Sequence, residues 1–158
     1  MIKSILVLLI SCTLLTIVSC SPNRVYEKHI KDFPSYRWDA NRCIDFTFDI
    51  EDTASMYDIF FAFRHINGWQ FKFINIKAII KSPSDITYEN SYSLKVMDNN
   101  GEYLSNCAGD LCDFEKIIER DFRFTETGIY TISFQQTMPI DPLPNIMEVG
   151  LIVKRSSK

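Results

Sequence analysis

Cys43-Ile44-Asp45-Phe46-Thr47-Phe48-Asp49-Ile50 alternates apolar and polar side chains without a break from Ile44 onward. Successive side chains of a β-strand point to opposite faces, so a period of two places all the apolar residues of this segment on one face. The segment therefore predicts a strand with one face in a hydrophobic core and the other in water.

Similar strands are expected on the C-terminal side of this segment. Residues 57–66 (YDIFFAFRHI) end at Asn67-Gly68, a turn signal typical of hairpins, and residues 69–81 form the return strand. Further apolar or alternating stretches cover residues 91–97, 129–138 and 147–154. Amphipathic helices between the strands are missing, which argues against a parallel α/β fold. We therefore predict an all-β fold, an antiparallel, jelly-roll-like β-sandwich over residues 38–158.

Residues 113–121 interrupt this series of strands. Phe114, Ile117 and Ile118 recur at helical spacing, and Asp113 precedes them as a candidate N-cap. We expect a short helix or an irregular crossover here.

The N-terminus has the pattern of a bacterial lipoprotein signal. Lys3 supplies a positive charge, residues 5–18 are almost entirely apolar, and Ile17-Val18-Ser19-Cys20 matches the lipobox. We expect residues 1–19 to be removed and Cys20 to carry S-diacylglycerol and an N-acyl group. The alternative is a membrane anchor that is never cleaved, in which Cys20 has no role.

Lipidation of Cys20 would hold the mature chain on a membrane without spanning it, because two or three acyl chains anchor stably. We expect no cofactor besides this covalent lipid. Pro22 and Pro34 disfavour regular structure, so residues 20–37 are interpreted as lipid anchor and tether, within which residues 24–27 could form a short edge strand.

Three cysteines follow Cys20, and an exported protein can form disulfides. Cys107 and Cys112 lie in one loop and are a candidate disulfide. Cys43 would then be a free, buried thiol at the start of a strand. Pairing of Cys43 with either loop cysteine remains an open alternative.

Catalytic motifs are missing from the sequence: it has no nucleophile elbow, phosphate loop or zinc-protease helix. The only histidines are His29 and His65, and the cysteines lack a second pair, so we expect no metal site. His65 is interpreted as an exposed histidine at a strand end rather than a general base. We predict no catalytic residues, no enzyme and no small-molecule substrate.

Two residue groups suggest ligands but have simpler explanations. Four acidic residues could form a glycosidase pair or a calcium site, yet strand alternation already explains them as a solvated face: Asp45, Asp49, Glu51 and Asp52. Most aromatic residues fall on core faces, which leaves Tyr36 and Trp38 as candidate surface contacts. The net charge of −3 provides no basic face, so nucleic acid is not an expected partner.

Several segments together resemble a known family. In chain order they are Val25-Tyr26-Glu27-Lys28, Asp32-Phe33-Pro34 with Trp38, the strand Phe46–Ile50, Phe63-Arg64, Asn75, Gly128-Ile129-Tyr130, Gln136-Thr137-Met138, Leu143 and Glu148-Val149-Gly150-Leu151. In this order the chain resembles the gliding motility lipoprotein GldH family of Bacteroidetes over nearly its whole length. It departs from the family pattern at Pro139, where a basic residue is usual, and in the cysteine pair Cys107 and Cys112.

The resemblance implies a component of the gliding motility machinery or of the protein secretion associated with it, with no known catalytic residues. The expected partners are a membrane, through the lipid, and other envelope proteins of that machinery. The alternative is an envelope module that binds glycans or peptides. Bacteroidetes lipoproteins exposed at the cell surface commonly carry an acidic cluster directly after the lipidated cysteine, and Ser21-Pro22-Asn23-Arg24 has none. We therefore expect the periplasmic side, with the inner or outer membrane undecided.

Overall fold

A computed structural model describes residues 23–157, and this range is built almost entirely of strands. It contains one short 3-10 helix, η1 (Pro34–Tyr36), and no α-helix. The strands are β1 (Arg24–Ile30), β2 (Arg37–Trp38), β3 (Ile44–Ile50), β4 (Tyr57–Ile66), β5 (Phe73–Lys81), β6 (Thr87–Lys95), β7 (Asn106–Ala108), β8 (Leu111–Phe122), β9 (Gly128–Gln136), β10 (Leu143–Pro144) and β11 (Ile146–Arg155).

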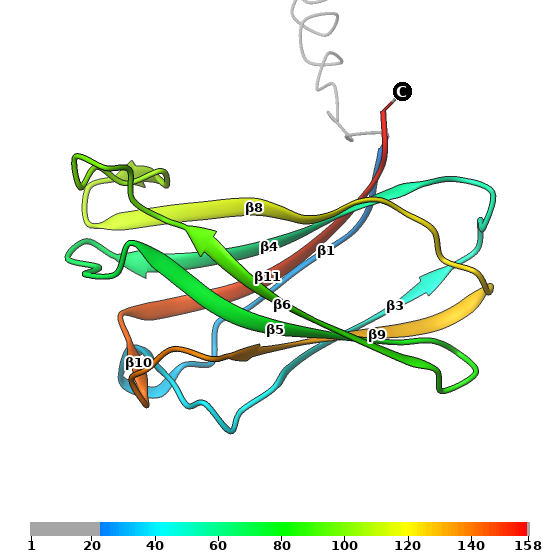
Figure 1. Ribbon diagram of the computed structural model, residues 1–158, viewed down its shortest axis with the longest axis horizontal. Coiled ribbons are helices and arrows are strands. Elements are labelled where there is room, and N and C mark those ends of the chain that lie inside the picture. Colours follow the sequence, from blue (N-terminus) through cyan, green and yellow to red (C-terminus); the bar gives the residue numbers. More distant parts are fainter. Residues whose placement is uncertain (1–22, 158) are drawn as a thin grey trace, which may run out of the picture.

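The strands form two facing sheets in which every pairing is antiparallel (Figure 1). One sheet has the order β1-β11-β4-β8-β7 and the other β3-β9-β5-β6, while β10 and β2 form a small separate pair. If the eight long strands are renumbered in chain order, the sheets read 1-8-3-6 and 2-7-4-5. This is the order of a jelly roll, in which two Greek keys wrap into a sandwich. The predicted fold class is confirmed.

The core lies between the sheets because each strand directs its alternate apolar residues inward. In β3 the apolar residues Ile44, Phe46, Phe48 and Ile50 are buried while the polar residues between them are exposed, as the alternation predicts. Aromatic rings join the two sheets: Phe61 of β4 meets Phe134 of β9 edge to face, with ring centroids 5.1 Å apart. Such contacts between rings add to the stabilisation from buried area.

The folded domain begins earlier than the sequence analysis expected. Arg24–Ile30 is an ordered strand that pairs with β11, so it belongs to the five-stranded sheet and not to a tether. The two ends of the domain lie side by side, because the backbone N–H of Arg155 donates to the carbonyl oxygen of Asn23 at 2.7 Å. Cys20 and the predicted cleavage site lie outside the described residues.

The helix or irregular crossover expected over residues 113–121 is wrong, since this segment belongs to the long strand β8. The register between β4 and β8 shifts between Tyr57 and Ile59 and again between Ile59 and Phe60. Each shift inserts an extra residue into β8, which is a β-bulge, and a bulge breaks the period of two. The spacing of Phe114, Ile117 and Ile118 therefore imitates a helix.

Candidate functional site

A depression lies on the outer face of the five-stranded sheet, and we call it the sheet-face hollow. It has a volume of about 520 Å³ and is lined by Glu27, His29, Lys31, Ala62, Phe63, Arg64, Asp113, Phe114, Glu115, Glu148 and Ile152. The strand order creates it. His29 of β1 pairs with Gly150 of β11, Gly150 with Ala62 of β4, and Ala62 with Glu115 of β8. The two central positions, Gly150 and Ala62, have the smallest side chains, so the centre of this face is recessed. Longer charged side chains surround it.

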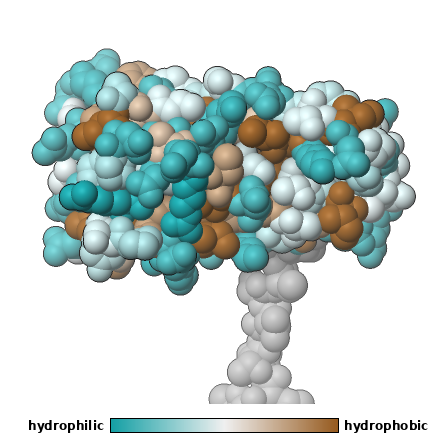
Figure 2. All heavy atoms as spheres, turned by 90° about the horizontal axis from the view of Figure 1, so that it is seen from below, coloured by the Kyte–Doolittle hydropathy of each residue, from teal (hydrophilic) through white to brown (hydrophobic). Residues whose placement is uncertain are grey.

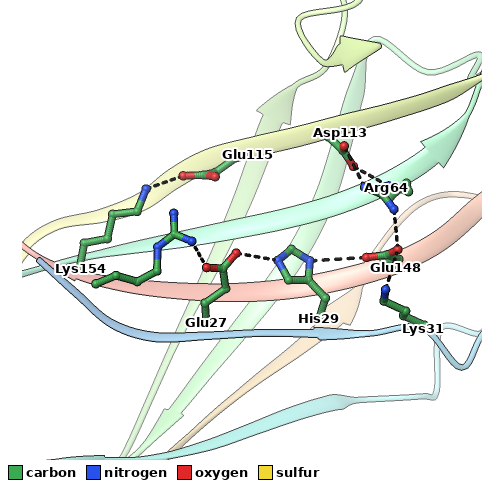
Figure 3. Close-up of polar contacts among 9 residues, drawn as sticks. Glu27, His29, Lys31, Arg64, Asp113, Glu115, Glu148 and Lys154 are labelled. Atoms are coloured by element: carbon green, nitrogen blue, oxygen red, sulfur yellow. Dashed lines mark hydrogen bonds and ion pairs between the residues drawn. The ribbon is translucent and has the colours of Figure 1, made fainter. Parts of the chain in front are cut away.

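His29 lies directly over Gly150. A Cβ atom at position 150 would lie 2.5 Å from Nδ1 of His29, a distance at which one of the two groups must move. Glycine is required here by the close approach of the imidazole ring, which crosses the backbone of β11. The ring lies between two carboxylates, with Nε2 3.3 Å from Oε1 of Glu27 and Nδ1 3.8 Å from Oε2 of Glu148 (Figure 3).

Arg64 links the next row of cross-strand neighbours. Its Nε and Nη2 donate to the two carboxylate oxygens of Asp113 at 2.6 and 3.0 Å, and its Nη1 donates to Oε1 of Glu148 at 2.8 Å (Figure 3). The bidentate hydrogen bonds raise the pKa of Arg64 and lower the pKa of Asp113. The guanidinium therefore holds two strands, β8 and β11, to β4 through charged groups.

Glu148 is the most enclosed charge of the hollow, with 8% of the residue exposed. Besides Arg64, its carboxylate is approached by Nζ of Lys31 at 3.6 Å. On the opposite rim, Nζ of Lys154 donates to Glu115 at 2.8 Å and lies 4.1 Å from the centre of the Phe60 ring. Charges of both signs thus alternate around the hollow, and each of those named has an opposite partner.

The hollow is lined mainly by charged groups that are already paired. Its lining contains no serine, threonine or cysteine that could act as a nucleophile, and its carboxylates are held by basic groups. Its two aromatic residues, Phe63 and Phe114, are buried and present no free ring for stacking. Within residues 23–157, no three or more His, Cys, Asp and Glu side chains are grouped in a way that could hold a metal ion.

Trp38 is not a surface residue, so the expectation of a surface contact is wrong for its side chain. It is fully buried, it pairs with Leu143 through β2 and β10, and its indole Nε1 donates to the carbonyl of Arg42 at 2.9 Å. It closes one end of the sandwich beside Phe33. Tyr36 is 51% exposed and lies in η1, away from the hollow.

His65 is also placed differently from expectation, since it is fully buried. Its Nε2 lies 3.0 Å from the hydroxyl of Ser105, and its ring packs among Phe63, Trp69 and Tyr103. Burial lowers the pKa of His65. Its role is to fill the core at the end of β4.

The cysteines and the acidic strand residues lie outside the hollow. Cys107 and Cys112 face each other across the β7–β8 hairpin and are joined in a disulfide. Cys43 is free and exposed, which corrects the expectation that it is buried. Asp45 and Asp49 are exposed on β3, and Asp52 accepts hydrogen bonds from the Ser55 hydroxyl and two backbone N–H groups, which lower its pKa.

No role was predicted from the sequence for Arg64, Glu148 or His29. A signal was present: Arg64 and Glu148 each interrupt an apolar strand, and they carry opposite charges. A charge inside an apolar run suggests a partner, because an unpaired charge is costly to bury. The pattern does not say which strand supplies that partner.

Exposed hydrophobic residues of the described range, 23–157, are spread over several elements. The larger ones come from separate elements and include Tyr36, Phe73, Ile86, Tyr88, Leu104 and Ile129. On the face drawn in Figure 2, hydrophobic residues stand in small groups separated by hydrophilic ones. Among residues 23–157, no helix has the length and apolar character needed to cross a membrane.

Fold and site define an antiparallel jelly-roll domain with a charged hollow on the outer face of one sheet. The sequence model of the GldH lipoprotein family matches residues 24–153. This chain therefore belongs to the GldH lipoprotein family.

Two relatives carry this name. The chain is 25% identical over 151 residues, 91% of each chain, to the gliding motility lipoprotein GldH homolog of Christiangramia forsetii. It is 22% identical over 161 residues, 98% of each chain, to the gliding motility lipoprotein GldH of Flavobacterium johnsoniae.

Similarity to solved structures is weak. TmCBM61 in complex with β-1,4-galactotriose is 16% identical, with a TM-score of 0.34 over 86% of this chain and 90% of the other. A structure of infectious bursal disease virus, strain Gx, is 15% identical, with a TM-score of 0.29 over 82% of this chain and 30% of the other.

Proposed function

We propose that this chain is a non-enzymatic, lipid-anchored component of the gliding motility machinery and of the protein secretion associated with it. It contacts another envelope protein through the sheet-face hollow. The observation that carries this proposal is the arrangement around Glu148: an enclosed carboxylate on the outer face of the sheet, approached by Arg64, Lys31 and His29. Such a rim of paired charges gives specificity and orientation to a protein contact.

A protein partner is favoured over a glycan. Glycan binding calls for exposed aromatic rings beside polar groups, whereas Phe63 and Phe114 in the hollow are buried. The rim does present exposed charges of both signs, such as Lys31 and Glu115. Opposite charges on a partner would find matching groups there.

Anchoring through Cys20 would place the domain close to the membrane, on its periplasmic side. Three residues, Ser21 to Asn23, separate Cys20 from the first residue of β1. At roughly 3.5 Å per residue, Arg24 lies within about 14 Å of the lipid-bearing residue. The domain has little freedom to move away, so its partner must also lie at the membrane surface.

Cross-linking in intact membranes tests the proposal. The full chain is recovered after cross-linking, and its partners are identified by mass spectrometry for the unchanged protein and for Lys31→Glu with Glu115→Lys. These two substitutions reverse rim charges that are 71% and 41% exposed, so the fold should persist. A matched control reverses Asp45→Lys and Lys81→Glu, which lie on the four-stranded sheet.

We expect motility or secretion components to be lost from the rim variant and retained by the control. If both variants recover these components equally, the contact does not lie at the hollow. If the unchanged chain recovers no envelope protein, the proposed role as a component of the machinery is itself contradicted.

A further inference from the structure

Strand β6 forms one edge of the four-stranded sheet. Residues Thr87–Lys95 pair with β5 along their whole length without a register shift. Within residues 23–157, no other strand pairs with the second side of β6. An edge of this kind presents backbone N–H and C=O groups that another strand can pair with.

The ladder shows which residues present these groups. At its two ends the N–H of Ser82 donates to the carbonyl of Ile86, and the N–H of Val96 donates to the carbonyl of Lys72, both at 2.8 Å. Hydrogen-bonded pairs alternate with non-bonded pairs along an antiparallel ladder. The even-numbered residues of β6 therefore bond to β5. The odd-numbered residues direct their backbone groups to the free edge: Thr87, Glu89, Ser91, Ser93 and Lys95.

Other edges of the two sheets are protected against self-pairing. β7 has only three residues, so β8 is an edge beyond Asp113, and its two bulges interrupt that edge. β1 has a register shift near Arg24. On β3, two copies pairing about Thr47 would place Asp45 opposite Asp49, and like charges in that position repel. Short edges, irregularities and charges are the usual protections.

β6 is neither short nor irregular, and its two charged residues are of opposite sign. It is nine residues long, contains neither proline nor glycine, and carries only two charged residues, Glu89 and Lys95. Both lie on the outer face, because the neighbouring residues of the inner face pair with the buried residues Ile76, Ala78 and Ile80 of β5.

We propose that β6 pairs with β6 of a second copy of this chain, antiparallel and centred on Tyr92. This register keeps odd-numbered residues opposite odd-numbered residues, so the free backbone groups meet. It places Glu89 opposite Lys95 of the second copy, and the two-fold symmetry forms this ion pair twice. The two four-stranded sheets become one continuous sheet.

The charges identify the occupant. A strand from an unrelated protein would match Glu89 and Lys95 only by chance, whereas a second copy matches both by symmetry. Self-pairing thus brings opposite charges together in β6, whereas self-pairing of β3 would bring acidic residues together. Confinement to a membrane raises the local concentration of copies and so favours a weak contact.

Zero-length coupling with a carbodiimide tests the pairing directly. Equal amounts of unlabelled and heavy-isotope-labelled full-length chain are mixed in detergent micelles, coupled and digested. We expect peptides in which Glu89 of one isotope is joined to Lys95 of the other. Cross-links only between residues of the same copy, in a chain that sediments as a monomer, would overturn the proposal.

Proline substitution supplies a sharp control. Ser91→Pro removes an N–H group that points to the free edge, so the β5–β6 ladder and the thermal midpoint should be nearly unchanged while the mixed-isotope cross-link disappears. Asn90→Pro removes an N–H group that bonds to β5 and should destabilise the fold. A dimer that persists in folded Ser91→Pro would contradict pairing through β6.

Charge exchange supplies a second control. Lys95→Glu places like charges opposite each other at both ends and should weaken association at least about tenfold. The double variant Glu89→Lys with Lys95→Glu restores opposite charges and should restore association. Asp45→Lys, on the other edge strand, should leave it unchanged, and loss of association in that variant would assign the contact to β3.

Discussion

The imidazole of His29 occupies the space that a side chain at Gly150 would fill, with Nδ1 2.5 Å from the position of a Cβ atom there. His29 belongs to β1, near the start of the described chain, and Gly150 belongs to β11, near its end. The strand order brings the two residues together, and the missing side chain at Gly150 leaves room for the imidazole ring. It is also the most direct place to test the geometry of the sheet-face hollow.

Gly150→Ala should lower the free energy of unfolding by about 1–3 kcal/mol, because the new methyl group must displace the His29 ring. Denaturant unfolding of the single variants and of the double variant His29→Ala with Gly150→Ala measures the coupling between the two positions. We expect the double variant to recover part of the loss. Strictly additive effects would show that the ring does not occupy this space.

Glu148→Gln should lower the free energy of unfolding by about 1–2 kcal/mol, because it leaves Arg64 with one carboxylate partner and removes the partner of Lys31. The expected loss of free energy is smaller than for a fully buried pair, because about a third of the Arg64 side chain is exposed to solvent. Glu115→Gln, at an exposed ion pair, is the matched control and should cost less than about 1 kcal/mol. An equal cost for both variants would mean that enclosure of Glu148 is unimportant.

Stability should fall as the pH drops below about 6.5, the usual pKa of histidine in an unfolded chain. Burial lowers the pKa of His65 in the folded chain. Between the two pKa values the unfolded chain therefore binds a proton at His65 that the folded chain does not bind. Stability is full above about pH 6.5 and is lost as the pH falls towards the folded pKa. Denaturation midpoints of the unchanged chain and of His65→Gln, measured between about pH 5.5 and 7, check this. The same slope in both would assign the dependence to another group.

Trp38→Ala should lower the free energy of unfolding by about 3–5 kcal/mol, because it empties a fully buried position at the end of the sandwich. Tyr36→Ala, two residues earlier and 51% exposed, should change it by less than about 0.5 kcal/mol. Thermal or denaturant unfolding of the two variants side by side makes the comparison. A mild effect of Trp38→Ala would contradict its burial.

Cys20→Ser should prevent lipid attachment and leave a soluble or uncleaved precursor, because the proposed lipid is attached to the thiol of Cys20. Metabolic labelling with a fatty acid and fractionation of the membranes measure this, with Cys43→Ser as the control. Normal labelling of Cys20→Ser would overturn the lipidation proposal, and loss of labelling in Cys43→Ser would move the lipid to the exposed thiol.

The sequence by itself determined the fold class and most of the long strands, but not β8. Alternate residues are apolar throughout β3, from Tyr57 to Phe63 in β4 and from Tyr130 to Phe134 in β9. A period of two is a local property that needs no knowledge of neighbours. The lipobox is local in the same way. The family resemblance used several such segments in order, and the family match bears it out.

Only the tertiary structure decided which strands pair and therefore which residues meet in the sheet-face hollow. The hollow combines His29, Gly150, Ala62 and Glu115 from four strands that are distant in the chain. The bulges of β8 and the burial of Trp38 and His65 likewise depend on partners that no local pattern names. The period of a strand determines which of its faces is apolar. Which strands become neighbours is determined by how the two sheets close over one shared core.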